Sequence, residues 1–168
     1  MTPEQKVRLA EKGWLTRAKQ GRPGIARRIA DALNKDASQI CFSDFTLTKE
    51  LSDLFAQQVV ACEFVEARDR TGALEMVAVA LDRLPNALFL LPSGFDDCGM
   101  VSIEVTDLKG HLDDLLSSQY EALRLISPDG KAGVSLITQE ATLPLSPRFV
   151  KIWYGGRQNR PGEQKGTR

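Results

Sequence analysis

Short separators between apolar runs constrain the fold of this chain more than any other feature of its sequence. From residue 59 onward, apolar runs alternate with turn segments such as 68–72 (RDRTG) and 127–130 (SPDG). A parallel strand needs a crossover of about a dozen or more residues before it can pair, so such short turns predict antiparallel neighbours. The runs expected to form strands are 59–67, 74–81, 87–91, 100–105, 122–126, 133–138 and 149–154. We therefore predict a mostly antiparallel, five- to seven-stranded sheet.

Two further segments have the periodicity of helices that lie on a sheet. Residues 107–119 place leucines at helical spacing on one side and acidic residues on the other. The leucines concerned are Leu108, Leu112, Leu115 and Leu116. Residues 48–58 show a similar pattern, with Thr48 as the expected N-cap. The chain is therefore expected to belong to the α+β class, with one or two helices packed on a face of the sheet.

The N-terminal residues predict helix with one interruption. Pro3 suits the first position of a helix, because its missing amide proton would have no partner there. Residues 21–24 (GRPG) contain two glycines and a proline, which strongly disfavour continuation of that helix. A second helix is expected over 25–33, where isoleucine and leucine recur four positions apart. The sequence thus predicts a helical hairpin, and it leaves open whether this hairpin packs on its own sheet or on another chain.

These patterns divide the chain into three parts. Residues 1–35 form the predicted basic helical hairpin, and residues 36–155 form the α+β domain. Residues 156–168 contain no large apolar side chain, so this basic tail is expected to be disordered on its own. The whole chain of 168 residues, 42% of them hydrophobic, falls in the range of a single domain that buries its own core.

The formal net charge is zero, but the charges are unevenly distributed along the chain. Residues 1–35 carry nine Lys and Arg against three Asp and Glu, and residues 157–168 carry four against one. The body, 36–156, carries nine basic against eighteen acidic residues. Such segregation is informative about partners. The basic candidates for contact with a partner or with phosphates are Arg17, Lys19, Arg22, Arg27, Arg28, Arg157 and Arg160.

The basic N-terminus raises the hypothesis of nucleic-acid binding. Ala30, Asn34 and Ile40 meet the spacing of a helix-turn-helix, but the segment that would read bases, 38–46, contains Asp44 and no Arg or Lys. This argues against a base-reading helix at that place. The alternative that remains is contact with the phosphate backbone through the basic ends, without sequence readout.

The residues that suggest an enzyme are Cys98 and His111, the latter being the only histidine. A thiol and an imidazole oriented by a carboxylate would form a nucleophilic site if the fold brought them together. The carboxylates considered, which also define a candidate acidic face, are Asp96, Asp97, Asp113 and Asp114. The preferred interpretation of 92–99 is a turn-rich loop in which Cys98 fills space. Without EF-hand or P-loop spacing, we expect no metal and no cofactor.

The remaining features favour a cytoplasmic protein without a membrane segment. No apolar run approaches the roughly 20 residues that cross a bilayer. The three cysteines form no C-x-x-C pair, so we expect them to be reduced. The leading hypothesis is a non-enzymatic protein-binding or regulatory module with a protein partner, such as an immunity or inhibitor-type protein or an accessory subunit of a bacterial complex. The sequence does not determine the oligomeric state.

Overall fold

A computed structural model describes residues 2–120, 122–138 and 148–154, and its elements confirm the α+β class. In chain order these are α1 (Pro3–Leu33), the 3-10 turn η1 (Ala37–Gln39), α2 (Phe45–Ala61), β1 (Val65–Ala67), α3 (Arg70–Leu81), β2 (Ala87–Leu90), α4 (Phe95–Cys98), β3 (Val101–Glu104), α5 (Val105–Ser118), β4 (Ala122–Ile126), β5 (Gly133–Thr138) and β6 (Arg148–Trp153). The predicted tail, 156–168, lies outside the described residues, as do Arg157 and Arg160.

The described strands form one sheet in the order β1-β6-β5-β4-β2-β3, and every neighbouring pair is antiparallel. This confirms the prediction from the short turns. At the β3 edge, Phe42 forms an isolated antiparallel bridge with Val101 of β3. The β1 edge has β6 as its only hydrogen-bonded neighbour within the described part of the chain.

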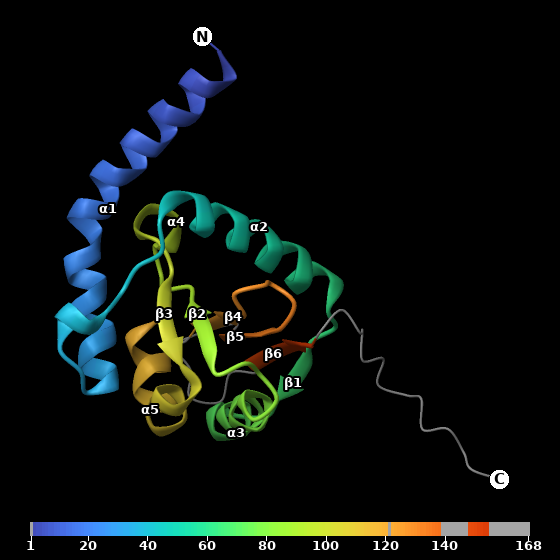
Figure 1. Cartoon of the computed structure of the whole chain (residues 1–168). Coiled ribbons are helices and arrows are strands. Elements are labelled where there is room, and N and C mark those ends of the chain that lie inside the picture. The colour runs from blue at the N-terminus through green and yellow to red at the C-terminus, as the bar shows by residue number, and fades with distance from the viewer. Residues whose placement is uncertain (1, 121, 139–147, 155–168) are drawn as a thin grey trace.

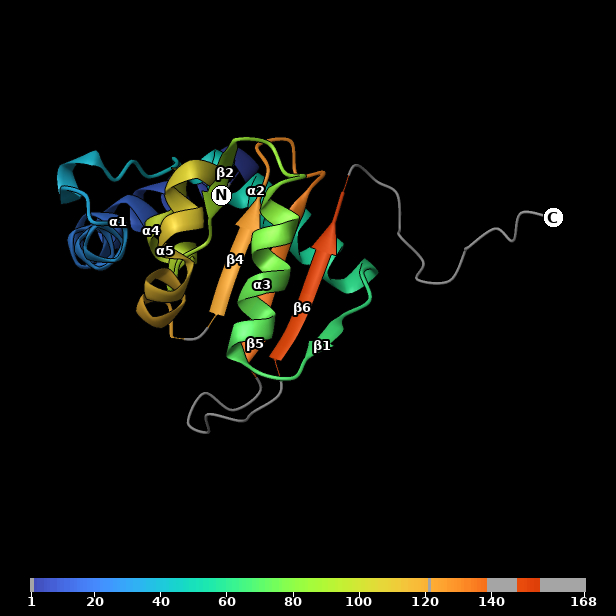
Figure 2. The same ribbon diagram turned by 90° about the horizontal axis from the view of Figure 1, so that it is seen from below.

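Helices cover both faces of the sheet, but to different extents (Figure 1, Figure 2). Helices α3 and α5 lie on one face, where Val77, Leu115 and Leu136 belong to the larger buried cluster. Helix α2 lies on the other face, where Phe55 and Trp153 belong to a smaller one. Helix α1 packs against α4 and α5 beside the β3 edge. The sheet therefore has one face covered by two helices and the other covered by α2.

The predicted break at residues 21–24 is wrong, because α1 is one helix that contains Pro23. The buried residues on both sides of the expected break, such as Trp14 and Ile29, lie against the same body. Packing of this continuous face outweighs the low helix propensity of the glycines and proline, since propensity is only a weak local preference. The helix ends at Asn34, whose left-handed conformation (φ 52°) is a common C-terminal cap.

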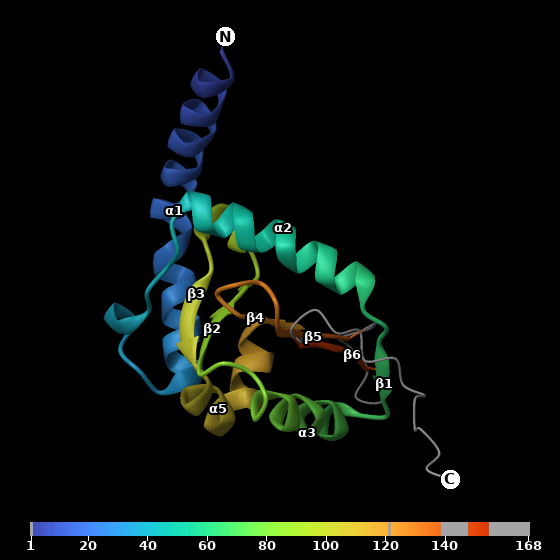
Figure 3. The ribbon, with the colours of Figure 1, turned by 45° about the vertical axis from the view of Figure 1, so that its right-hand side comes forward.

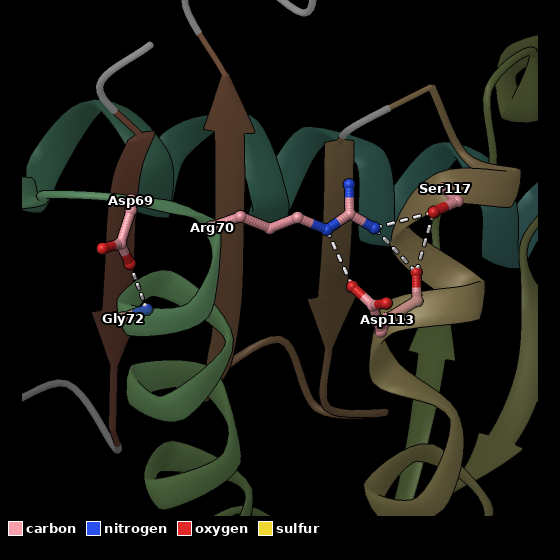
Figure 4. Close-up of polar contacts among 5 residues, drawn as sticks. All are labelled: Asp69, Arg70, Gly72, Asp113 and Ser117. Atoms are coloured by element: carbon pink, nitrogen blue, oxygen red, sulfur yellow. Dashed lines mark hydrogen bonds and ion pairs between the residues drawn. The ribbon is translucent and has the colours of Figure 1, made fainter. Parts of the chain in front are cut away.

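One expected strand is also wrong, and another is wrong in part. Residues 74–81 belong to α3, which begins where the Asp69 carboxylate accepts a hydrogen bond from the Gly72 amide at 2.8 Å (Figure 4). Residues 59–61 complete α2, so that only 65–67 of the expected 59–67 strand pair in the sheet. Helix α2 itself is capped by Asp44, and Thr48 lies inside it. The β-branched residues that suggested strands are thus accommodated in helices with strong N-caps.

Candidate protein-binding surfaces

The first three turns of α1 project away from the body of the protein (Figure 1, Figure 3). Every residue from 3 to 12 is exposed, and Trp14 is the first residue of the helix to be buried. We call residues 3–12 the arm. Its N-terminus is closed by a capping box, in which the Gln5 amide donates to the Thr2 hydroxyl at 3.3 Å and the Thr2 amide donates to the Gln5 side chain at 2.9 Å. The arm is therefore a capped helix that covers none of the protein's own core.

A stripe of free cations runs along the arm and continues past its base. Arg8, Lys12 and Lys19 are separated by four and seven positions, which places them on one side of the helix. All three are exposed, and none forms an ion pair within the described residues. We call these three the basic stripe. Val7 and Leu9, 57% and 62% exposed, give the arm apolar contact surface as well.

The base of the arm is fixed to the short helix α4. The Trp14 indole donates to the Asp96 carbonyl at 2.8 Å, and Arg17 pairs with Asp97 at 2.6 Å. The Trp14 ring also lies 5.6 Å from that of Phe45 at the start of α2. An open hollow of about 220 Å³ adjoins these contacts. Its lining residues are Trp14, Phe45, Thr48, Lys49, Ser52, Asp53 and Asp96.

Arg22, one of the predicted contact residues, is part of the internal structure. Its guanidinium donates to the Cys98 carbonyl at 2.8 Å and to the Ser43 carbonyl at 2.7 Å. It also lies 5.1 Å from the ring centres of both Trp14 and Phe42. With its donors used in this way, Arg22 joins α1 to the segment before α2 and to the last residue of α4, and it does not present a free charge to a partner.

The other basic candidates differ in their availability. Arg28 lies over the Tyr120 ring at 5.4 Å and donates to the Tyr120 hydroxyl at 2.9 Å. Lys19 and Arg27 are exposed and have no ion pair in the part of the chain that the structure describes. The structure thus leaves Lys19 and Arg27 free, and engages Arg17, Arg22 and Arg28.

The predicted acidic face is divided between two helices. Asp96 and Asp97 lie in α4, whereas Asp113 and Asp114 lie in α5. Asp113 pairs with Arg70 at 2.7 Å, and the same guanidinium donates to the Ser117 hydroxyl at 2.7 Å (Figure 4). One aspartate of each pair is therefore used to join helices.

The structure gives Cys98 a packing role. The thiol is buried against Gly21 of α1, where an added Cβ would approach the sulfur to under 3.0 Å. Burial raises the pKa of the Cys98 thiol, Asp97 raises it further, and Arg22 opposes the change. His111 lies at a kink in α5 and makes no hydrogen bond to Cys98 in the described structure. This environment favours the protonated thiol, which is the unreactive form.

Three further observations bear on the function classes. The described residues contain no group of three or more His, Cys, Asp or Glu that could hold a metal ion. None of the helices in the described ranges is long and apolar enough to cross a membrane. Comparison with protein-family models, curated proteins and solved structures finds no match for this chain. The candidate surfaces are therefore interpreted from their own chemistry.

The arm has only a weak signature in the sequence. Arg8 and Lys12 are not among the predicted contact residues, because the sequence predicts a helical hairpin and does not set its first ten residues apart from the rest. The available signal was the composition of residues 3–12, where only Val7, Leu9 and Ala10 are apolar apart from the proline. A helical segment with so little apolar surface has no reason to dock on its own core.

Proposed function

We propose that the protein is a non-enzymatic protein-binding or regulatory module that engages an acidic partner protein through the arm and the basic stripe. The observation that supports this most is the full exposure of residues 3–12 in a helix that carries its own N-terminal cap. A preformed helix needs little ordering when it binds, which lowers the entropic cost of association. An inhibitor-type protein or an accessory subunit of a larger complex would use such an element.

The charge distribution supports an acidic partner. Arg8, Lys12 and Lys19 span eleven positions, or about 16 Å of helix at about 1.5 Å per residue. Cations that have no internal partner remain available to attract an oppositely charged surface and to orient the approaching molecule. Their effect is expected mainly on the rate of association and to weaken as salt is added.

The test compares the wild type with two triple charge reversals. The stripe variant carries Arg8→Glu, Lys12→Glu and Lys19→Glu, and the control carries Arg68→Glu, Arg83→Glu and Lys131→Glu, all exposed positions outside α1. Each protein is immobilised and exposed to lysate of its native host, with and without nuclease. A purified stoichiometric protein partner should then bind the stripe variant with an association rate constant about tenfold lower, and the control variant unchanged.

Nucleic-acid contact, the competing hypothesis, predicts a different pattern. Material captured through phosphates would disappear after nuclease treatment, and no protein would remain in stoichiometric amount. That result would overturn the proposal, as would a partner that binds the stripe variant as fast as the wild type. The engagement of Arg22 and Arg28 in internal contacts already reduces the number of cations that a phosphate backbone could meet.

A further inference from the structure

The face of the sheet beneath α2 is only partly covered. One row of residues across the strands, formed by Phe89, Ile126, Gly133 and Trp153, lies at the level of α2. Ile126 and Trp153 are buried there together with Phe55 of α2. The ring of Trp153 lies over Gly133, where any side chain would collide with the indole. Helix α2 thus covers this row and completes the small core on this side.

The next row on the same face is polar. Arg124, Ser135 and Lys151 stand side by side on β4, β5 and β6, two residues along each strand from the buried row. Ser135 is only 4% exposed, while both cations are half-buried. Lys151 donates to the Val59 carbonyl at the end of α2 at 2.5 Å. Arg124 makes no side-chain hydrogen bond or ion pair with any described residue, although it lies in the middle of a sheet.

The third row is apolar on β4, β5 and β6 and ends on β1 at exposed Glu66, which lies opposite Phe149. Ala122, Ile137 and Phe149 are neighbours across the same three strands. Ile137 is 40% exposed, and Phe64, 55% exposed, packs edge-on against Phe149 with ring centres 4.8 Å apart. We call Phe64, Arg124, Ile137, Phe149 and Lys151 the sheet-face patch. It combines two cations with the apolar side chains of the third row, and α2 contacts it at Val59, whose carbonyl binds Lys151.

The dimensions of this surface match those of one more helix. From Ile126 to Ala122 the strand advances four residues, or about 13 Å at about 3.3 Å per residue. Helices pack side by side at about 8–10 Å. A helix lying next to α2 would therefore cover the apolar row and leave the two cations between the two helices. The helical layer on this face has room for one helix that the described chain does not supply.

We infer that the sheet-face patch binds an acidic amphipathic helix of a partner protein. The apolar side of that helix would cover Ile137, Phe149 and Phe64, and its carboxylates would meet Arg124 and Lys151. These two cations stand two strands apart, or about 10 Å, which corresponds to glutamates about seven positions apart on a helix. The arm of a second copy is a poor occupant because its basic stripe would be repelled by both cations.

This inference concerns a surface separate from the arm and goes beyond the proposed function. The probe is a cross-linked helical peptide of about 15 residues, with two glutamates seven positions apart and leucines between them on the same side. A second peptide carries lysines in place of the glutamates. Binding is measured by fluorescence anisotropy, and the contact surface is mapped from amide chemical-shift changes in the labelled full-length protein.

The acidic peptide should bind the wild type and shift the amides of Ser135, Ile137 and Phe149. Arg124→Glu should weaken binding about tenfold, and Phe64→Ser about threefold or more. Phe64 is largely exposed, so its substitution tests the patch without disturbing the core. Arg27→Glu, the same charge change on the exposed side of α1, should leave binding unchanged. The lysine peptide should not bind, and added salt should weaken the acidic complex.

Several results would overturn the inference. These are an absence of binding to the wild type up to millimolar peptide, equal binding of Arg124→Glu and the wild type, or shifts confined to the β1 edge at Val65. The stripe variant should bind the peptide as the wild type does. Failure to capture a protein partner that depends on the basic stripe, with the peptide still bound by the wild type, would count against the proposed function alone. Capture of such a partner without any peptide binding would count against the sheet-face patch alone.

Discussion

The contact between Gly21 and Cys98 gives the sharpest test of the packing of α1. A methyl group added at Gly21 would lie under 3.0 Å from the Cys98 sulfur, which is closer than real side chains approach. Cys98 is 4% exposed, and its carbonyl is bound by Arg22, so α4 cannot move freely away from α1. We therefore predict that Gly21→Ala destabilises the wild-type protein but stabilises a Cys98→Ala variant.

The expected magnitudes follow from two opposing effects. Alanine is favoured over glycine by about 1 kcal/mol inside a helix. Overpacking of a filled core costs about 1–3 kcal/mol, so the net effect of Gly21→Ala should be a loss of up to about 2 kcal/mol. In the Cys98→Ala background the sulfur is absent, and the same substitution should add about 1 kcal/mol. The coupling between the two sites is then about 1–3 kcal/mol.

The assay is urea unfolding of the four proteins of this double-mutant cycle. Gly24→Ala is the matched control, because nothing lies within 4 Å of a Cβ at that position in the same helix. It should stabilise both backgrounds by about 0.5–1 kcal/mol. An equal effect of Gly21→Ala in the two backgrounds would refute the close contact. Stabilisation of the wild type by Gly21→Ala would refute it as well.

Two further predictions concern Cys98 and Arg22. Cys98 should react with iodoacetamide more slowly than glutathione near neutral pH, and its rate should rise at a higher pH than that of glutathione, because burial raises its thiol pKa. Exposed Cys41 should react first, and a Cys98 faster than the free thiol would instead support the cysteine-enzyme hypothesis. Arg22→Lys should lower the free energy of unfolding by about 1.5–3 kcal/mol through loss of its two carbonyl contacts. Arg27→Lys should change it by under about 0.5 kcal/mol, and equal effects at the two sites would contradict a structural role for Arg22.

The sheet was predictable because its evidence is local. Residues 127–130 must turn, and the runs on each side are too close in sequence for anything but antiparallel pairing, which β4 and β5 confirm. Helix α3 is not predicted because 74–81 is apolar apart from Glu75 and contains two valines, so periodicity could not distinguish helix from strand. The signal that identifies a helix is Asp69, whose carboxylate caps α3 by accepting a hydrogen bond from the amide of Gly72, three residues later.

The continuity of α1 could not be read from its own sequence. Glycine and proline at 21–24 signal a break, and the reason that they do not cause one lies in distant residues. Gly21 accommodates Cys98, and Arg22 binds the carbonyls of Ser43 and Cys98, contacts that exist only after α4 has docked. The tertiary packing of this face therefore overrides a local preference worth about 1 kcal/mol per glycine.

For the candidate surfaces, the sequence shows that basic residues are concentrated in α1. It does not show which of them are free to contact a partner and which are held by internal contacts. Arg22 and Arg27 cannot be distinguished in the sequence of a basic helix. In the structure Arg22 donates to the carbonyls of Cys98 and Ser43, whereas Arg27 is exposed. Taken alone, neither Arg124 nor Lys151 indicates a binding surface, because each is a single cation in a strand whose side chains alternate between the two faces of the sheet. Only the register, which sets both beside Ser135, shows that they share one face.

The position of Trp14 separates two functions within α1. Beyond it, the helix buries residues through Leu33 and is joined to α4 by Arg17 with Asp97, while Lys35, just after the helix, pairs with Asp107 of α5. Before it, the arm buries nothing, and it exposes Val7 and Leu9. Because the arm buries no apolar side chain, it adds little to the stability of the fold. A capped, basic helix that leaves its own core uncovered has its physical use in contact with another molecule.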